Sequence, residues 1–201
     1  MNKISQWFLI VYAGLITAAF MLLFYAYNAV RSSDEITAKR INIVDEQGVN
    51  RLVISNEERM EPPIINGKKY ERAVHPAGII FYNEKGDECG GIALSRNPVT
   101  HTYALALDYD NADAIGLITQ QNRENNSFRS GLLVNDKDHS GRVGSNISRI
   151  SLMSENGNSS LVINGPDEKP RIIISVDSLG KPHFQMIDNK GDIIRDFAVA
   201  E

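Results

Sequence analysis

The sequence predicts an all-β protein behind one N-terminal transmembrane α-helix, with the β part arranged as an antiparallel β-meander that forms a rolled or barrel-like sheet. Three observations predict this fold class. Residues 7–30 contain no charged side chain. From Ile41 onward, short runs rich in Ile, Val and Leu alternate with turn-forming residues. After the apolar stretch, no segment repeats apolar residues at helical spacing over three turns.

The apolar stretch is long enough to cross a bilayer. A membrane span needs about 20 apolar residues, and residues 7–30 read WFLIVYAGLITAAFMLLFYAYNAV. Trp7 stands at one end and Tyr25 and Tyr27 at the other, where amphipathic rings favour the headgroup level. A cleaved signal peptide is the alternative, but its apolar core has about 7–15 residues and ends in small side chains. We therefore expect an uncleaved anchor that contacts the lipid bilayer through residues 7–30.

Two further features concern the anchor. Gly14 and Ala18 form a small-xxx-small pattern, which makes them a candidate helix-association site. A count of basic residues on the two sides of the stretch places the C-terminal domain in the cytoplasm. Long domains, however, translocate largely regardless of charge, and a short basic N-terminus before a lone anchor commonly stays inside. We expect an extracytoplasmic C-terminal domain.

Composition excludes several classes of protein. Lys3 is the only charged side chain before Arg31, so residues 31–201 carry 20 basic and 25 acidic side chains, a net charge of −5. Nucleic-acid-binding modules usually present a basic face, so no nucleic-acid partner is expected. Cys89 is the only cysteine. An intrachain disulfide is therefore excluded, and the domain must be stabilised by its own core or by association.

The chain divides by composition into an anchor (1–30), a juxtamembrane linker (31–40) and a β-rich domain (41–201). Strands are expected at 41–44, 51–55, 78–82, 90–95, 103–109, 114–119, 130–135, 149–154, 160–164, 171–176 and 183–188. Residues 171–176, RIIISV, are apolar on both faces and are typical of a strand covered on both sides. A long excursion at 56–77 interrupts the series, with a hairpin signal at Asn66-Gly67. Such a loop is either functional or a flexible insertion at the rim.

A loosely repeated turn separates the strands. Asp, Asn or Ser opens each unit through its side chain, and Gly follows three residues later, where a positive φ is required. The units are 45–48, 83–86, 154–157, 177–180 and 188–191. Their spacing is irregular, so a strict solenoid is not expected.

No motif points to catalysis. The four histidines are widely spaced and form no HxH or HExxH arrangement, which a local zinc site would need. There is no GxSxG, GxxxxGK[ST] or GxGxxG sequence. A triad assembled across the fold stays open, so enzymatic activity is uncertain and the sequence leans against it. No catalytic residue, no cofactor-binding residue and no cofactor is expected.

Acidic side chains are densest between two expected strands. Asp108, Asp110 and Asp113 are candidate calcium ligands, because Ca²⁺ prefers carboxylate oxygens. The EF-hand pattern fails, since its sixth and twelfth positions would fall on Asp113 and Thr119. An irregular calcium site and a set of solvated turn carboxylates are the two interpretations.

Two strings carry a resemblance. RINIVDEQGVNRLVISNEERM, followed by GIIFYNEKGDECGGIALS, resembles an uncharacterised family of bacterial proteins with an N-terminal hydrophobic helix and a β-rich C-terminal domain. The resemblance covers residues 38–136 best. It implies a bacterial origin and a fold, and no reaction. With it, the expected location is the bacterial cell membrane, single-pass, with the C-terminal domain in the periplasm.

Three functions remain. The first is a membrane-anchored, non-enzymatic interaction or assembly module that binds a protein partner or forms a homo-oligomer, because the edge strands of a meander must be covered. The second is an envelope module that binds a small ligand, a glycan or calcium. The third is a membrane-tethered hydrolase built from dispersed residues.

Overall fold

The computed structural model describes residues 3–31, 35–72 and 74–197. The chain forms two compact units, residues 1–38 and residues 39–201. Each unit is described by itself.

The first unit is one long apolar helix, α1 (Lys3–Arg31). Its segment Ile4–Tyr27 is long and apolar enough to cross a membrane, a test that a signal sequence also passes. The side chains of this segment are exposed all round, as expected of a helix without a polar face. The predicted N-terminal apolar helix is confirmed.

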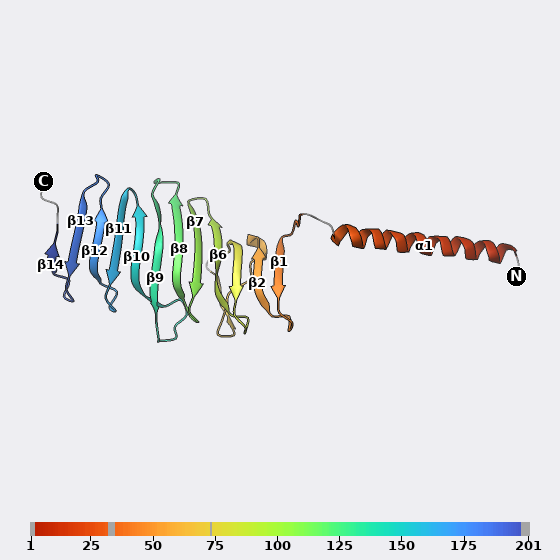
Figure 1. The fold of residues 1–201 in the computed structure, drawn as a ribbon, viewed down its shortest axis with the longest axis horizontal. Helices are drawn as coiled ribbons and strands as arrows, with labels where there is room; N and C mark the ends of the chain where they lie inside the picture. Colours follow the sequence, from red (N-terminus) through yellow and green to blue (C-terminus); the bar gives the residue numbers. More distant parts are fainter. Residues whose placement is uncertain (1–2, 32–34, 73, 198–201) are drawn as a thin grey trace. The chain divides into compact units, whose positions relative to one another are not determined.

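The second unit is dominated by one sheet of 12 strands. In chain order these are β1 (Arg40–Val44), β2 (Asn50–Ser55), β5 (Ala77–Tyr82), β6 (Glu88–Arg96), β7 (Thr100–Asp108), β8 (Asp113–Asn122), β9 (Phe128–Lys137), β10 (Asn146–Glu155), β11 (Asn158–Asn164), β12 (Pro170–Val176), β13 (Pro182–Ile187) and β14 (Ile193–Asp196). Each strand pairs antiparallel with the next, so the strands lie side by side in chain order (Figure 1). The predicted all-β class and antiparallel meander are confirmed, and β1 and β14 form the two edges.

The predicted turn chemistry recurs almost unchanged in four connections. The side-chain oxygen of Asp45, Asn83, Asp177 or Asp188 accepts hydrogen bonds of 2.8–3.0 Å from the backbone N–H groups two and four residues later. The glycine three residues after each has a φ of 80–95°, which other residues rarely adopt. The unit predicted at 154–157 is different. Its first two residues belong to β10, and Asn156-Gly157 forms the two-residue turn of the β10–β11 hairpin. Asn-Gly is the dipeptide that such turns prefer.

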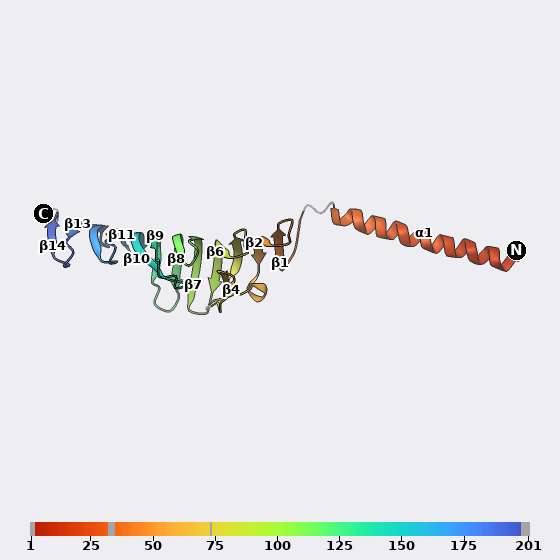
Figure 2. The same cartoon turned by 90° about the horizontal axis from the view of Figure 1, so that it is seen from below.

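The sheet is a single layer. In the described part of the chain, every pair of elements in extensive contact is a pair of strands adjacent in the sheet or in the β3–β4 hairpin. Figure 2 shows the sheet strands edge-on in one row. The interpretation of residues 171–176 as a strand covered on both sides is therefore wrong for the isolated chain, in which Ile174 of β12 is 46% exposed. Its double-sided apolar pattern reflects a single sheet whose two faces both carry apolar residues.

The two faces of the sheet differ in what lies on them. We call the face that carries Val53 and Ile80 the excursion face, and the opposite face, which carries Leu105 and Leu117, the ladder face. Residues between β2 and β5 contain a short 3-10 helix (Glu57–Arg59) and the predicted hairpin, β3 (Ile64–Ile65) and β4 (Lys68–Lys69). Met60 of this segment, with Val53, Ile80 and Tyr82 of the excursion face, forms a cluster of buried apolar side chains.

Polar contacts fix the excursion on the sheet. Arg40 of β1 forms an ion pair of 2.8 Å with Glu61, and its guanidinium also donates to the Arg59 carbonyl at 2.9 Å. At the tip of the hairpin, the Gly67 N–H donates to the Asp87 carboxylate at 2.7 Å. The excursion predicted at 56–77 therefore supplies a partial second layer over the first strands, and it is not a free loop at the rim.

Candidate functional site

The ladder face carries an unbroken row of large apolar side chains. Residues directly opposite each other in paired strands point to the same face, so the register defines rows across the sheet. One row takes a single residue from each of 11 consecutive strands: Ile41, Ile54, Ile79, Ile92, Leu105, Leu117, Leu132, Leu152, Leu161, Ile174 and Phe184. Ten of these are Ile or Leu, and the eleventh is Phe. We call this row the central ladder.

A second apolar row runs beside the central ladder on the same face. It contains Ile43, Leu52, Phe81, Gly90, Leu107, Ile115, Val134, Ile150, Ile163, Ile172 and Met186. At the β14 edge the stacked ring of Phe197, 5.1 Å from that of Phe184 between centroids, extends the apolar surface. No residue of the two rows is charged from β1 to β13.

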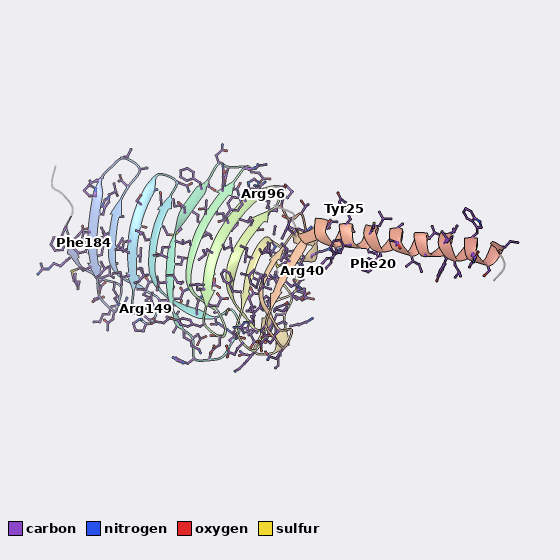
Figure 3. All side chains as sticks on the ribbon, turned by 45° about the vertical axis from the view of Figure 1, so that its right-hand side comes forward. Phe20, Tyr25, Arg40, Arg96, Arg149 and Phe184 are labelled. Atoms are coloured by element: carbon purple, nitrogen blue, oxygen red, sulfur yellow. The ribbon has the colours of Figure 1, made fainter. Side chains whose placement is uncertain are left out.

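These side chains face solvent. Leu117 and Leu152 are each 52% exposed, and Leu107 and Ile54 are also exposed. Leu94, beside the central ladder on β6, is exposed as well. A shallow depression of about 650 Å³ lies over the middle of the face, between Ile92 and Leu152. Figure 3 shows side chains standing out from the sheet along its length, with Phe184 near the C-terminal edge. Exposed apolar surface of this continuity is typical of a binding surface.

The apolar surface is large. Twelve strands spaced about 4.8 Å apart span roughly 50 Å, and two to three rows of alternate residues are roughly 14 Å wide. The footprint is therefore about 700 Å². The largest apolar patch of an ordinary monomer is about 300–600 Å², and a standard protein–protein interface takes about 800 Å² from each partner.

The excursion face offers less apolar surface. Over β5 to β8, two adjacent rows of this face are glycine and alanine except at one end of each, where Ile80 of β5 and Ile118 of β8 stand. The small residues are Gly78, Gly91, Ala93, Ala104, Ala106 and Gly116. The excursion covers part of the first strands, with Met60 packed over Val53 and Ile80. Charged side chains of the ladder face stand near the strand ends, and Figure 3 labels two of them, Arg96 and Arg149. Arg96 lies over the ring of Tyr103, and Arg149 forms an ion pair with Asp136.

A small polar cavity lies on the excursion face, at the ends of β6 and β7. Its volume is about 180 Å³, and its lining includes Glu88, Asp108 and Asp113. Arg72 of the excursion forms an ion pair with Glu88, and the side chains of both are only 15% exposed. This pair ties the excursion to β6.

The three candidate calcium ligands, Asp108, Asp110 and Asp113, all line this cavity, but their interactions differ. Burial, together with the negative charges of Asp113 and Glu88, raises the pKa of Asp108 to about 7. Asp110 instead pairs with Lys137 at 2.6 Å, and this hydrogen bond lowers its pKa. The interpretation of solvated turn carboxylates suits Asp110, and it does not suit Asp108, whose Oδ1 is buried without a hydrogen-bond partner. Among the described residues, no group of three or more His, Cys, Asp or Glu side chains is placed to hold a metal ion.

Asn111, between β7 and β8, holds the 138–145 loop. Its side chain is almost fully buried, and Nδ2 lies 3.0 Å from the Ser145 carbonyl oxygen and 3.2 Å from that of Arg142. The Gly144 N–H donates to the Asn111 carbonyl at 2.8 Å. The cluster that composition marks as acidic is therefore partly a structural clamp, which Asn111 forms through its side-chain amide.

The other predicted residues take the following places. Trp7, Tyr25 and Tyr27 lie exposed on α1, and a side chain added at Gly14 would meet no atom within 4 Å. Ala18 lies one helical turn after Gly14, so the two small residues share one face of α1, on which a second helix could pack. Burial raises the pKa of Cys89, which disfavours the reactive thiolate.

Comparison of this chain with models of protein families, with curated proteins and with solved structures gives no match. The resemblance to a bacterial family therefore stays a prediction, and the argument for function rests on the residues of the site.

Proposed function

We propose that this protein is a single-pass, membrane-anchored and non-enzymatic assembly module, whose ladder face binds a protein surface. The observation that carries this proposal is the central ladder: 11 consecutive strands each contribute one large apolar residue to one solvent-facing row. Removal of such a surface from water is the main favourable contribution to protein association. The pattern recurs in 11 of the 12 strands of the sheet, which is typical of a binding surface.

The small core of the second unit supports the same proposal. Among the described residues, four large apolar side chains are buried, and all of them lie in or beside the excursion. Stable domains are built from packed layers that share a hydrophobic core. From β7 to β14, the described strands have no second layer within the unit. A partner on the ladder face would supply that layer.

The anchoring part of the proposal has its own test. Helix α1 has the length of a membrane span, and alkaline carbonate should leave the full chain in the membrane pellet. A mature chain that begins after Tyr27 by mass spectrometry would contradict the anchor and favour a signal sequence. Protease added to spheroplasts should cleave the β unit, while cleavage only after lysis with detergent would contradict a periplasmic domain.

The ladder face can be tested by its accessibility in membranes. The full chain, with Cys89→Ser to remove the native thiol, would carry Leu117→Cys on the ladder face of β8 or Arg129→Cys on the excursion face of β9. Both positions are exposed within one chain, so a water-soluble maleimide would label both equally if the protein stood alone. A docked ladder face predicts slow labelling at residue 117 and fast labelling at residue 129. Equal, fast labelling would contradict the proposal.

The polar cavity supports a second candidate function, the binding of a small cation or polar ligand. The supporting observation is the buried, unpartnered Oδ1 of Asp108 beside a second carboxylate, that of Asp113. A cation that binds both carboxylates must displace the proton that Asp108 retains near neutral pH. Calorimetry with calcium at pH 6 should then show proton release that disappears in Asp108→Asn. Identical heats in two buffers of different ionisation enthalpy would contradict this candidate.

A further inference from the structure

We infer that the partner of the ladder face is a second copy of this chain, packed face to face so that two ladders form the core of a two-layer sandwich. This inference rests on the proposed function, because it names the partner of the same surface. It accounts for a unit of 12 strands with a single layer. Two sheets stacked about 10 Å apart would bury both ladders between them.

The ladder face is compatible with itself. In a two-fold symmetric interface, a residue near the axis meets its own counterpart, so a charge there repels its copy. From β1 to β13, neither apolar row contains a charged residue. The regular rows of Ile and Leu, about 7 Å apart along each strand, also provide ridges and grooves that a second copy matches. Because the row repeats from strand to strand, two copies can pack at more than one angle between the strand directions of their sheets.

The size of the surface fits this partner. Its footprint of about 700 Å² per chain is close to the roughly 800 Å² that each partner gives to a standard interface. The middle of the face lies over β8 and β9, the sixth and seventh strands of the sheet order. A second copy centred there would cover the most exposed members of the central ladder, Leu117 and Leu152.

Lipid is a poorer occupant of the same face. A sheet that lay in hydrocarbon would also bury the unpaired backbone groups of its edges. The sheet is open, with β1 and β14 at its edges. The depression on the ladder face is shallow and does not enclose an acyl chain. A second sheet, in contrast, covers the face and leaves both edges in water.

The test is chemical cross-linking of the full chain in membranes. In the Cys89→Ser background, Leu117→Cys would place one thiol at the centre of the ladder face, and Arg129→Cys would place one on the opposite face. A bis-maleimide with a spacer of about 10 Å matches the separation of packed sheets. The reaction is prolonged so that the slowly labelled thiol reacts when the dimer opens and is joined to its partner when the dimer closes again. The inference predicts a cross-linked dimer for Leu117→Cys and none for Arg129→Cys.

The failures are distinguishable. If no cross-linked dimer forms but residue 117 labels slowly with a single maleimide in native membranes, the second copy is overturned. The proposal that some protein covers the ladder face is then retained. No dimer with fast labelling would overturn both proposals. In nanodiscs that hold one purified chain each, slow labelling would mean that lipid covers the face, and this too would overturn both.

A second measurement does not depend on cysteine chemistry. Leu117→Asp places two carboxylates within the paired ladders, where burial of unpaired charge is unfavourable. Because Leu117 is half exposed in one chain, the substitution leaves the core beside the excursion intact. We expect the dissociation constant of the detergent-solubilised full chain to rise about 100-fold or more, against a small change for Arg129→Asp. An unchanged constant in Leu117→Asp would overturn the inference.

Discussion

Leu105 and Leu117 lie directly opposite each other in the β7–β8 pairing, in the middle of the central ladder. Leu117 in turn lies opposite Leu132 of β9, and the row continues in both directions. Neighbours of this kind stabilise a sheet through side-chain contact across strands. Yet Leu117 remains half exposed, so pairing within the sheet uses only part of its apolar surface.

The Arg72–Glu88 ion pair should be a main attachment of the excursion. We expect Glu88→Gln to lower the free energy of unfolding by about 2–4 kcal/mol, because it leaves a mostly buried guanidinium unpaired. Urea unfolding of the full chain in detergent, followed by circular dichroism, measures this loss. The double variant Arg72→Met/Glu88→Leu should recover most of it. Equal losses in both variants would mean that the ion pair itself is not responsible.

Asp108 should make stability depend on pH. Its folded pKa of about 7 lies above the ordinary value of 3.8, so the folded chain binds more protons than the unfolded chain between these values. Stability from this group is therefore complete at low pH and is lost as the pH rises from about 4 to about 7. We expect Asp108→Asn to raise the melting temperature at pH 8 and to flatten the profile across that range. An Asp108→Asn profile parallel to that of the wild type would contradict the assignment.

Asn111 should control the 138–145 loop. Replacement by alanine leaves the carbonyl groups of Arg142 and Ser145 without the Nδ2 donor. We expect a loss of about 1–3 kcal/mol and faster hydrogen exchange in residues 138–145. His139→Ala, an exposed change in the same loop, should leave exchange unchanged. Equal exchange in the two variants would exclude the clamp.

The Asn83 turn should help to fix the β5–β6 register. Its side-chain oxygen accepts from the N–H groups of Lys85 and Asp87, so we expect Asn83→Ala to cost about 1 kcal/mol. Asn83→Asp keeps the acceptor and should cost less. A larger loss in Asn83→Asp than in Asn83→Ala, measured by urea unfolding, would contradict this role.

Much of the fold could be predicted from local sequence. The uncharged stretch at 7–30 predicts α1, and the Asp or Asn residues followed by Gly predict the turns, because both depend on neighbours in the chain. Asn66-Gly67 likewise predicts the β3–β4 hairpin. Eleven of the 12 sheet strands were predicted and β14 was missed. Strand ends shifted by up to three residues, as between the predicted 103–109 and the observed Thr100–Asp108.

The candidate site depends on relationships that local sequence does not contain. The central ladder requires the register of every strand pair, and bulges such as the one between Ser148 and Ile150 shift that register. The Arg72–Glu88 pair joins the excursion to β6 across 16 residues. The alternation at Tyr103, Leu105 and Leu107 was a usable signal for one strand, and its extension over the sheet appears only when the strands are placed side by side.

The central claim is that the ladder face is covered by a second copy of this chain. The most direct measurement is the protein mass of the detergent-solubilised full chain, by light scattering with the detergent contribution removed, over a concentration series. A dimer that becomes a folded monomer in Leu117→Asp would agree with the claim. A wild-type chain that remains a monomer at every concentration, with the circular dichroism of a folded sheet, would contradict it.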